Sequence, residues 1–202
     1  MKKRALIIFQ KNAVLGKVKT RISIDVGDVR AMEIYLKLVR HTHQVCKEID
    51  VPKFLFFSDF IPNDTSEFGQ EYSFEVQEGN DLGSRMANAF GRIFSKGYEE
   101  IIILGTDCAE LEFRIVENAF GLLEVNEVVI GPARDGGYYL LGMKKLFGEL
   151  FVDIPWSTEK VLLLTMEKLE NQSRSYGLLE ILSDVDRIED WRKIKDKLNV
   201  QS

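Results

Sequence analysis

Apolar residues along the chain occur in two alternating patterns. Short uninterrupted runs are separated by longer segments in which apolar residues recur every three or four positions. The first pattern is typical of buried strands and the second of helices that cover them. The clearest run is Ile101-Ile102-Ile103-Leu104, which Gly105-Thr106-Asp107 ends abruptly. Such a run predicts a central strand covered on both faces, with Asp107 at its carboxyl end.

The same patterns predict the other elements. We expect further strands at 4–9, 53–58, 72–77, 127–132, from 138 onward and at 177–182. We expect helices at 25–50, after Asp81, at 111–124, at about 158–171 and after Asp186. Because strands alternate with helices and no linker or repeat interrupts them, residues 1–202 are expected to form one three-layer α/β/α domain.

Composition places the chain among ordinary globular proteins. It has 202 residues, 45% of them hydrophobic and 29% charged, enough for a substantial core. The apolar runs are too short to span a bilayer, and Lys2-Lys3-Arg4 leads straight into a strand with no cleavage site, so we expect a cytoplasmic protein. Cys46 and Cys108 have no metal or redox spacing and are expected to be free, buried thiols.

The distribution of charge is more informative than its sum. A net charge of −5 argues against non-specific nucleic-acid binding. The first 24 residues nevertheless hold seven Lys or Arg residues and no acid. Four of these cations fall in the segment 10–21, together with Gly16: they are Lys11, Lys17, Lys19 and Arg21. A loop of this kind after a first strand can hold phosphate through backbone N–H groups and cationic side chains. The structural alternative is a solvated charged loop.

Carboxylates follow three later strands. They are Asp107, Asp135 in the segment Asp135-Gly136-Gly137, and the pair Asp184 and Asp186. Each has a structural alternative: Asp107 as the cap of a helix near 110, the glycines as a hairpin, and Asp186 with Glu189 as a capping box. His41 and His43 lie two apart on a predicted helix and point in different directions, so a histidine metal site is not expected.

Two helix starts carry further candidates. Asp81 lies between Gly79 and Gly83 at the start of the helix that contains Arg85, and it is either a simple cap or part of a second edge facing a ligand. Ser157 is predicted to cap the helix that follows it, with Thr158 as its first residue. Trp156 beside it is predicted to be a packed anchor rather than a platform for a ring.

The loops after the strands should gather at one edge of the sheet, where open α/β sheets bind ligands. A cationic loop opposite several carboxylates suits a nucleoside diphosphate bridged by Mg²⁺ or Mn²⁺, since cations hold phosphate oxygens and carboxylates hold the metal. This constellation predicts group transfer from a nucleotide donor.

A resemblance supports this hypothesis. The chain resembles the DUF2064 family, also described as selenodomain-associated transferase 1, within the GT-A-like nucleotide-diphospho-sugar transferase superfamily. The resemblance rests on the segments 11–21, 105–108, 131–142 and 156–158, and it covers nearly the whole chain. Segments 77–86 and 184–186 are also similar to those of nucleotidyltransferases, including the guanylyltransferases of deazaflavin-cofactor synthesis. Leu15 replaces a usual Pro, and Ala109-Glu110 a common Pro-Asp.

The resemblance implies a GT-A-like fold of Rossmann type with a mixed, mostly parallel sheet. It implies that Lys19 and Arg21 lie near donor phosphates, with Lys19 also a catalytic candidate, and that Asp107 is a metal ligand together with Asp184 or Asp186. It implies that Asp135 is the base or orients the acceptor. The remaining residues expected to contact the substrate are Gly16, Lys17, Asp81, Arg85, Gly136, Gly137, Trp156, Ser157 and Thr158.

Three functions remain open at this point. The first is a metal-dependent transferase that moves a group from a nucleotide-sugar donor to a small-molecule acceptor. The second is a nucleotidyltransferase that joins a nucleoside triphosphate to a phosphorylated small molecule. It gains weight because Thr106-Asp107-Cys108 has one acid where metal-dependent GT-A glycosyltransferases usually have Asp-x-Asp. The third is a nucleotide-binding protein of the same fold without catalysis.

Overall fold

A seven-stranded mixed sheet forms the centre of the protein. The computed structural model describes residues 2–199. The strand order is β3-β2-β1-β4-β6-β5-β7, and all neighbouring pairs are parallel except those that β6 makes with β4 and β5. The strands are β1 (Arg4–Gln10), β2 (Lys53–Phe57), β3 (Tyr72–Val76), β4 (Glu100–Gly105), β5 (Val128–Pro132), β6 (Tyr138–Met143) and β7 (Tyr176–Leu178).

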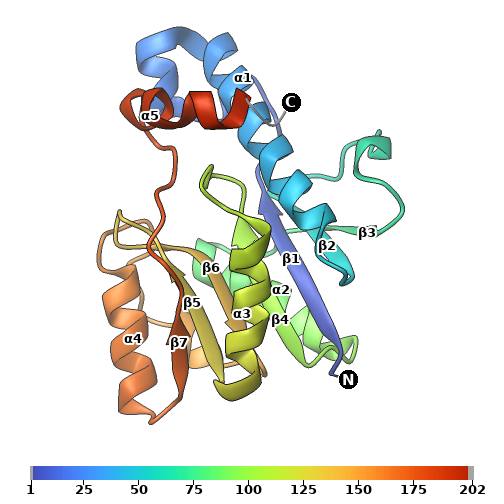
Figure 1. Cartoon of the computed structure of the whole chain (residues 1–202), viewed down its shortest axis with the longest axis vertical. Coiled ribbons are helices and arrows are strands. Elements are labelled where there is room, and N and C mark those ends of the chain that lie inside the picture. Colours follow the sequence, from blue (N-terminus) through green and yellow to red (C-terminus); the bar gives the residue numbers. More distant parts are fainter. Residues whose placement is uncertain (1, 200–202) are drawn as a thin grey trace.

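Helices cover both faces of this sheet (Figure 1). One face packs on α1 (Thr20–Lys47) and α3 (Phe113–Val125), and the other on α2 (Leu82–Ser95), α4 (Val161–Asn171) and the short helix η2 (Gly148–Phe151). A second short helix, η1 (Ser66–Phe68), precedes β3, and α5 (Ile188–Asn199) packs on α1. The predicted three-layer α/β/α fold with a mostly parallel mixed sheet is therefore confirmed.

The sequence pattern of the central strands explains this arrangement. Side chains of a strand alternate between faces, so an unbroken apolar run requires apolar cover on both sides. In β4, Ile102 and Leu104 contact the layer of α1 and α3, whereas Ile101 and Ile103 contact the layer of α2. All four are buried. β4 thus lies at the centre, and its carboxyl end opens toward Asp107.

Three predicted boundaries were wrong in ways that affect the site. α1 begins at Thr20 rather than at residue 25, so Arg21 lies in its first turn, and Gly27 interrupts the helix with a φ of 79°. α3 begins at Phe113 after Glu112, so Asp107 does not cap it. The last strand ends at Leu178, since the chain beyond it makes only isolated bridges, from Leu182 to Ala133 and from Asp184 to Cys108.

Both cysteines are free and buried, as predicted. Burial raises the pKa of Cys46 to about 12, because a thiolate is poorly solvated there. Within residues 2–199, no helix combines the length and the apolar character that a membrane crossing requires.

Candidate functional site

A cavity of about 760 Å³ opens at the carboxyl ends of β1, β2 and β4. The loop before α2, the first turn of α1, the β5–β6 hairpin and the segment after β7 complete its walls. Because β6 runs antiparallel, its first residue, Tyr138, lies at this same edge. The cavity is therefore lined by residues from both halves of the sequence. This confirms the prediction that the loops after the strands gather at one edge of the sheet.

Lys19 and Asp107 form the central ion pair of this cavity. Lys19 Nζ lies 2.7 Å from Asp107 Oδ1, and it also donates a hydrogen bond of 2.7 Å to the carbonyl oxygen of Val185. The Lys19 side chain is only 5% exposed, whereas that of Asp107 is 39% exposed. A buried ammonium needs such partners, because an unpaired charge in the interior is strongly destabilising. Lys19 is thus fixed, and one side of Asp107 stays open to a ligand.

Lys19 also has an unusual backbone conformation. Its φ of 47° and ψ of 44° are left-handed, which a side chain with a Cβ adopts only at some cost, on the order of 1 kcal/mol. The residue stands directly before α1 and turns the chain from the loop into the helix. This conformation directs the lysine side chain inward, toward β4 and the segment 184–186.

Asp184 lies beside this pair. An antiparallel bridge joins Cys108 and Asp184, and the N–H of Val185 donates a 2.9 Å hydrogen bond to the carbonyl oxygen of Asp107. Burial, together with the negative charges of Asp107 and Asp135, raises the pKa of Asp184 to about 7. Lys19 opposes this shift. Asp184 therefore belongs to a crowded set of carboxylates that favours an added cation.

Asp186 faces Arg21 at the outer edge of the cavity. Arg21 Nη1 lies 3.1 Å from Asp186 Oδ2. The predicted capping box of Asp186 and Glu189 was wrong, because Asp190 instead accepts from the backbone N–H groups of Asp186 and Arg187, at 3.3 and 2.9 Å. The carboxylate of Asp186 is thereby released from capping and contributes to the site.

Asp135 stands on the hairpin between β5 and β6. Its Oδ1 accepts a 2.9 Å hydrogen bond from the N–H of Gly137, so the carboxylate folds back over the turn. Gly136 has a φ of 86°, and a Cβ there would lie 2.2 Å from the carbonyl oxygen of Glu159. The hairpin explanation of the glycines thus holds, and Asp135 and Gly137 line the cavity as well, whereas Gly136 supports it from behind.

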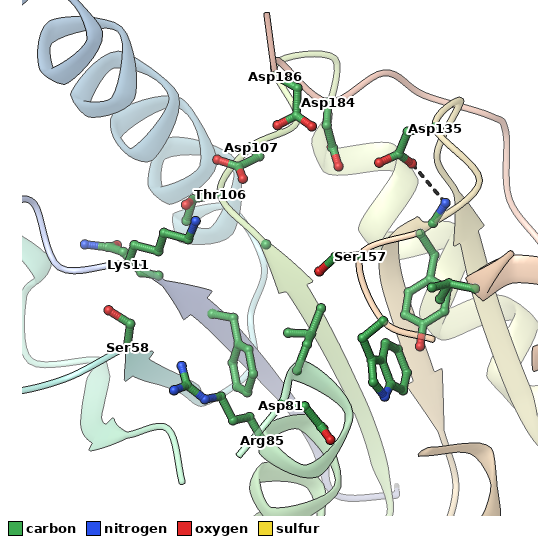
Figure 2. A pocket seen from close by; sticks show the side chains of 18 of the residues that line it. Lys11, Ser58, Asp81, Arg85, Thr106, Asp107, Asp135, Ser157, Asp184 and Asp186 are labelled. Carbon is green, nitrogen blue, oxygen red and sulfur yellow. Dashed lines mark hydrogen bonds between the residues drawn. The ribbon is translucent and has the colours of Figure 1, made fainter. Parts of the chain in front are cut away.

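The acidic end of the cavity suits a divalent cation by its chemistry. Asp107, Asp135, Asp184 and Asp186 all line it, and oxygen ligands are what Mg²⁺ and Mn²⁺ prefer (Figure 2). Residues 2–199 contain no group of three His, Cys, Asp or Glu side chains already arranged around one position. Mg²⁺ is commonly held by one or two carboxylates together with substrate phosphates. The donors therefore fit a cation that binds together with a phosphorylated ligand.

The opposite end of the cavity combines uncharged polar side chains with charged ones, among them Lys11 (Figure 2). Ser58, Gln77 and Asn80 line it. Asp81 lies here too, and its predicted role as cap of α2 is confirmed: Asp81 Oδ1 accepts from the N–H of Ser84 at 2.7 Å, and the Ser84 hydroxyl completes a capping box. Arg85 donates to the carbonyl oxygen of Gly79 at 3.1 Å and lines the same wall.

Trp156 is a packed anchor, as predicted, although it also lines the cavity. It stacks on Phe151 at 6.3 Å between ring centroids and meets Tyr138 edge-on at 6.4 Å. The predicted cap at Ser157 was wrong: Ser157 has a φ of 64°, and α4 begins only at Val161. The reason is that residues 157–160 form turns before the helix, so Ser157 and Thr158 line the cavity.

Besides Gly136, two predicted contacts do not line the cavity, and several lining residues were missed. Gly16 and Lys17 belong to the loop before α1 but do not line the cavity. The lining residues that the sequence did not single out include Gln10, Tyr35, Ser58, Gln77, Asn80 and Tyr138. Gln10, Ser58 and Gln77 each stand at or just after the end of a strand, so the rule that identified Asp107 could also have found them.

Comparisons with known proteins agree with this geometry. The model of a family described as "Uncharacterized protein conserved in bacteria (DUF2064)" matches residues 41–158, more than half of the chain. A search of curated proteins finds no match. Among solved structures, a nucleotide-diphospho-sugar transferase candidate from Desulfovibrio desulfuricans G20 is 29% identical, with a TM-score of 0.88 over 97% of this chain and 89% of that one.

More distant structures share the fold. A cytidylyltransferase from Leptospira borgpetersenii serovar Hardjo-bovis has 15% identity and a TM-score of 0.66, over 99% of this chain and 88% of that one. A CMP:2-keto-3-deoxy-manno-octonic acid synthetase complexed with CTP has 11% identity and a TM-score of 0.63, with both chains covered completely. At these identities the likeness concerns the fold alone.

Proposed function

Since the chain belongs to the DUF2064 family and has a GT-A-like nucleotide-diphospho-sugar transferase fold, we propose that it is a transferase that uses a nucleotide-activated donor. One observation carries the proposal: at one end of a 760 Å³ cavity, the cations Lys19 and Arg21 face the carboxylates of Asp107, Asp184 and Asp186. Cations and metal-binding carboxylates in contact are what a diphosphate with its divalent ion requires.

In this proposal, Lys19 and Arg21 bind the donor phosphates, and Asp107 holds Mg²⁺ or Mn²⁺ with Asp184 or Asp186. The ion, when bound, would neutralise negative charge on the departing phosphate groups. Lys19 is placed to exchange its contact with Asp107 for a phosphate oxygen, because both groups lie on the cavity wall. A buried, fixed ammonium would stabilise developing charge more strongly than a solvated one.

Asp135 is the proposed base for the acceptor. One of its oxygens already accepts from Gly137, and the other is left to accept the proton of an acceptor hydroxyl. As that proton moves to Asp135, the acceptor oxygen would form a bond to the transferred sugar carbon, and the bond to the nucleoside diphosphate would break. The donor we favour is a nucleotide sugar.

Nucleotidyl transfer is the second candidate. It is favoured by the single acid in Thr106-Asp107-Cys108 and by the several cytidylyltransferases among the structural neighbours, one of them complexed with CTP. In that reaction a phosphate oxygen of the acceptor attacks the α-phosphorus of a nucleoside triphosphate, and diphosphate leaves. The same carboxylates and cations would serve both reactions.

Ligand screening by thermal shift in the presence of Mg²⁺ separates these candidates. UDP- or GDP-sugars should stabilise the protein most if it transfers sugars, and a triphosphate if it transfers nucleotidyl groups. At a ligand concentration 100-fold above Kd, the expected gain is about 2.7 kcal/mol, or roughly 5–10 °C in Tm for a chain of this size. A noncatalytic nucleotide-binding protein would show the shift but no turnover with any acceptor.

Asp107→Asn tests the site itself. The variant keeps the shape of the side chain but loses its charge, so metal-dependent nucleotide binding should fall by at least about tenfold. Asp50→Asn, an exposed aspartate before β2 and away from the cavity, is the matched control and should bind like the wild type. If Asp107→Asn binds nucleotide and metal as tightly as the wild type, the proposed site is wrong.

A further inference from the structure

A chain of three polar side chains leads from the interior to the cavity. Tyr72 of β3 contacts His43 of α1, with 3.0 Å between the hydroxyl and Nδ1, and His43 contacts Gln10 at the end of β1, with 2.7 Å between Nε2 and Oε1. Each of the three residues is only 6% exposed. The site described above does not explain why polar groups are buried in this position.

The atom of Gln10 that faces His43 sets the direction of both hydrogen bonds, and this atom is the amide oxygen Oε1. An amide oxygen can only accept, so His43 Nε2 must carry the proton that Gln10 Oε1 receives. Burial, aided by the charge of Lys47, lowers the pKa of His43 to about 4, so the ring is neutral and carries a single proton. Nδ1 is therefore bare and accepts from the hydroxyl of Tyr72. Edge-on packing against Phe68, at 4.8 Å between centroids, holds the imidazole in place.

This direction leaves the amide nitrogen of Gln10 available. Gln10 lines the cavity, and within residues 2–199 its Nε2 makes no hydrogen bond. Gln77, the other glutamine of the wall, differs: its nitrogen donates to Phe56 and its oxygen faces Arg85 at 3.5 Å. Gln10 therefore presents N–H donors to the cavity, and its hydrogen bond with His43 holds the amide oxygen toward the interior.

The position of Gln10 indicates which part of a nucleotide it would meet. The carboxylates follow β4, β5 and β7, and the cations Lys19 and Arg21, which suit phosphates, lie at the start of α1. Ser58 and Gln77 instead follow β2 and β3, on the other side of β1. Figure 2 shows Ser58 and Arg85 across the cavity from Asp184 and Asp135. With the phosphates held by Lys19 and Arg21 at the acidic end, the base of the nucleotide is left for the end that Gln10, Ser58 and Gln77 line, beside Lys11 and Arg85.

We propose that Gln10 recognises a carbonyl oxygen of the nucleobase, and that His43 and Tyr72 are positioning residues that orient its amide. The inference rests on the proposed function, since it assumes a nucleotide in the cavity. Uracil, cytosine and guanine carry such an oxygen and adenine does not. The site is therefore expected to select against adenine nucleotides, because its donor would be left without an acceptor.

Isothermal titration with UTP, CTP, GTP and ATP in the presence of Mg²⁺ tests this selection. The wild type should bind at least one of the three carbonyl-bearing nucleotides more tightly than ATP. Gln10→Ala should weaken the binding of that nucleotide by about 2–10-fold, the effect of one neutral hydrogen bond, and should change the affinity for ATP by less than about twofold. Gln10→Glu places an acceptor against the carbonyl and should weaken the same nucleotide by about tenfold or more. Gln44→Ala, an exposed glutamine on α1, is the matched control.

A double-mutant cycle separates positioning from mere support of the fold. Tyr72→Phe removes the hydroxyl that bonds to His43 Nδ1, so His43 and the Gln10 amide are held less firmly, and roughly a 2–5-fold loss of affinity is expected. In the Gln10→Ala background, the same substitution should cause no further loss, whereas a purely structural effect would be additive. Far-UV circular dichroism and Tm establish that each variant is folded.

The outcomes distinguish the two proposals. If the wild type binds none of the four nucleotides and no UDP- or GDP-sugar, the proposed function fails and this inference fails with it. If nucleotides bind but both Gln10 variants weaken all four alike, or leave the ratio to ATP unchanged, only the inference is overturned. Additive effects of Tyr72→Phe and Gln10→Ala would remove the positioning role of the relay.

Discussion

Replacing Asp184 by Asn should stabilise the protein at alkaline pH. In the native protein, burial and the neighbouring charges of Asp107 and Asp135 raise the pKa of Asp184 from 3.8 to about 7. Between these two values the folded state binds the proton more tightly than the unfolded state, so this carboxyl lowers the free energy of unfolding as pH rises. The stabilisation that the protonated Asp184 carboxyl gives the folded state is fully present below about pH 4 and is lost above about pH 7.

The magnitude follows from the shift. About three pKa units correspond to roughly 4 kcal/mol over the whole range, at 1.36 kcal/mol per unit. Asparagine has nearly the same shape and does not titrate, so the Asp184→Asn variant lacks this dependence. From pH 5 to pH 8, the free energy of unfolding of the variant relative to the wild type should rise by about 2–3 kcal/mol, most of it before pH 7.

Urea unfolding followed by tryptophan fluorescence at pH 5, 6, 7 and 8, without divalent cations, measures this difference. A constant effect of the substitution on packing shifts the free energy of unfolding equally at every pH. Comparing how the difference between variant and wild type varies with pH therefore removes it. Asp50→Asn, at an exposed position, is the control and should show no such trend. Parallel pH profiles for the wild type and Asp184→Asn would refute the argument that the cavity holds a crowded, desolvated carboxylate.

Two further predictions concern packing and the basic segment. Gly83→Ala would place a Cβ 2.2 Å from Nε1 of Trp156 and should lower the free energy of unfolding by about 1–3 kcal/mol in the same urea titration. In Gly91→Ala, in the same helix, the nearest neighbour of the Cβ would lie at 3.6 Å. This variant should be neutral or more stable than the wild type by up to about 1 kcal/mol. Arg21→Met should weaken nucleotide binding by about 5-fold or more in calorimetry, and Lys17→Met by less than about twofold, since only Arg21 lines the cavity; equal losses would contradict the assignment of the phosphate end.

Apolar periodicity was enough to predict most of the fold. The order of strands and helices follows from runs such as that of β4, because burial on both faces leaves no other pattern for a central strand. Boundaries failed where local and tertiary preferences compete. Serine is a favoured N-cap residue, yet the chain turns at residues 157–160 before α4 begins, so Ser157 does not cap this helix. Asp186 has capping-box spacing, yet the pairing with Arg21 occupies its carboxylate.

The candidate site was predicted best where charge marks it. Lys19, Arg21 and the four aspartates stand out because charged residues in the segments that follow apolar runs are easy to recognise in a sequence. Gln10 and Tyr35 do not stand out, since a neutral polar residue at a strand end or on a helix has many possible roles. The buried contact of Gln10 with His43 joins residues 33 positions apart, and only the packing of α1 on the sheet brings them together.

The tie between Lys19 and the segment around Val185 has a consequence for biosynthesis. Lys19 leaves the ribosome long before its carbonyl partner, which follows more than 160 residues later. Ile188, Trp191 and Ile194, which pack on α1, are made later still. A nascent chain can therefore complete the sheet before the end of the cavity proposed to bind phosphates, around Lys19 and Asp184, has formed. Ligand capture should therefore begin only after the segment around Val185 has been synthesised and has packed against Lys19.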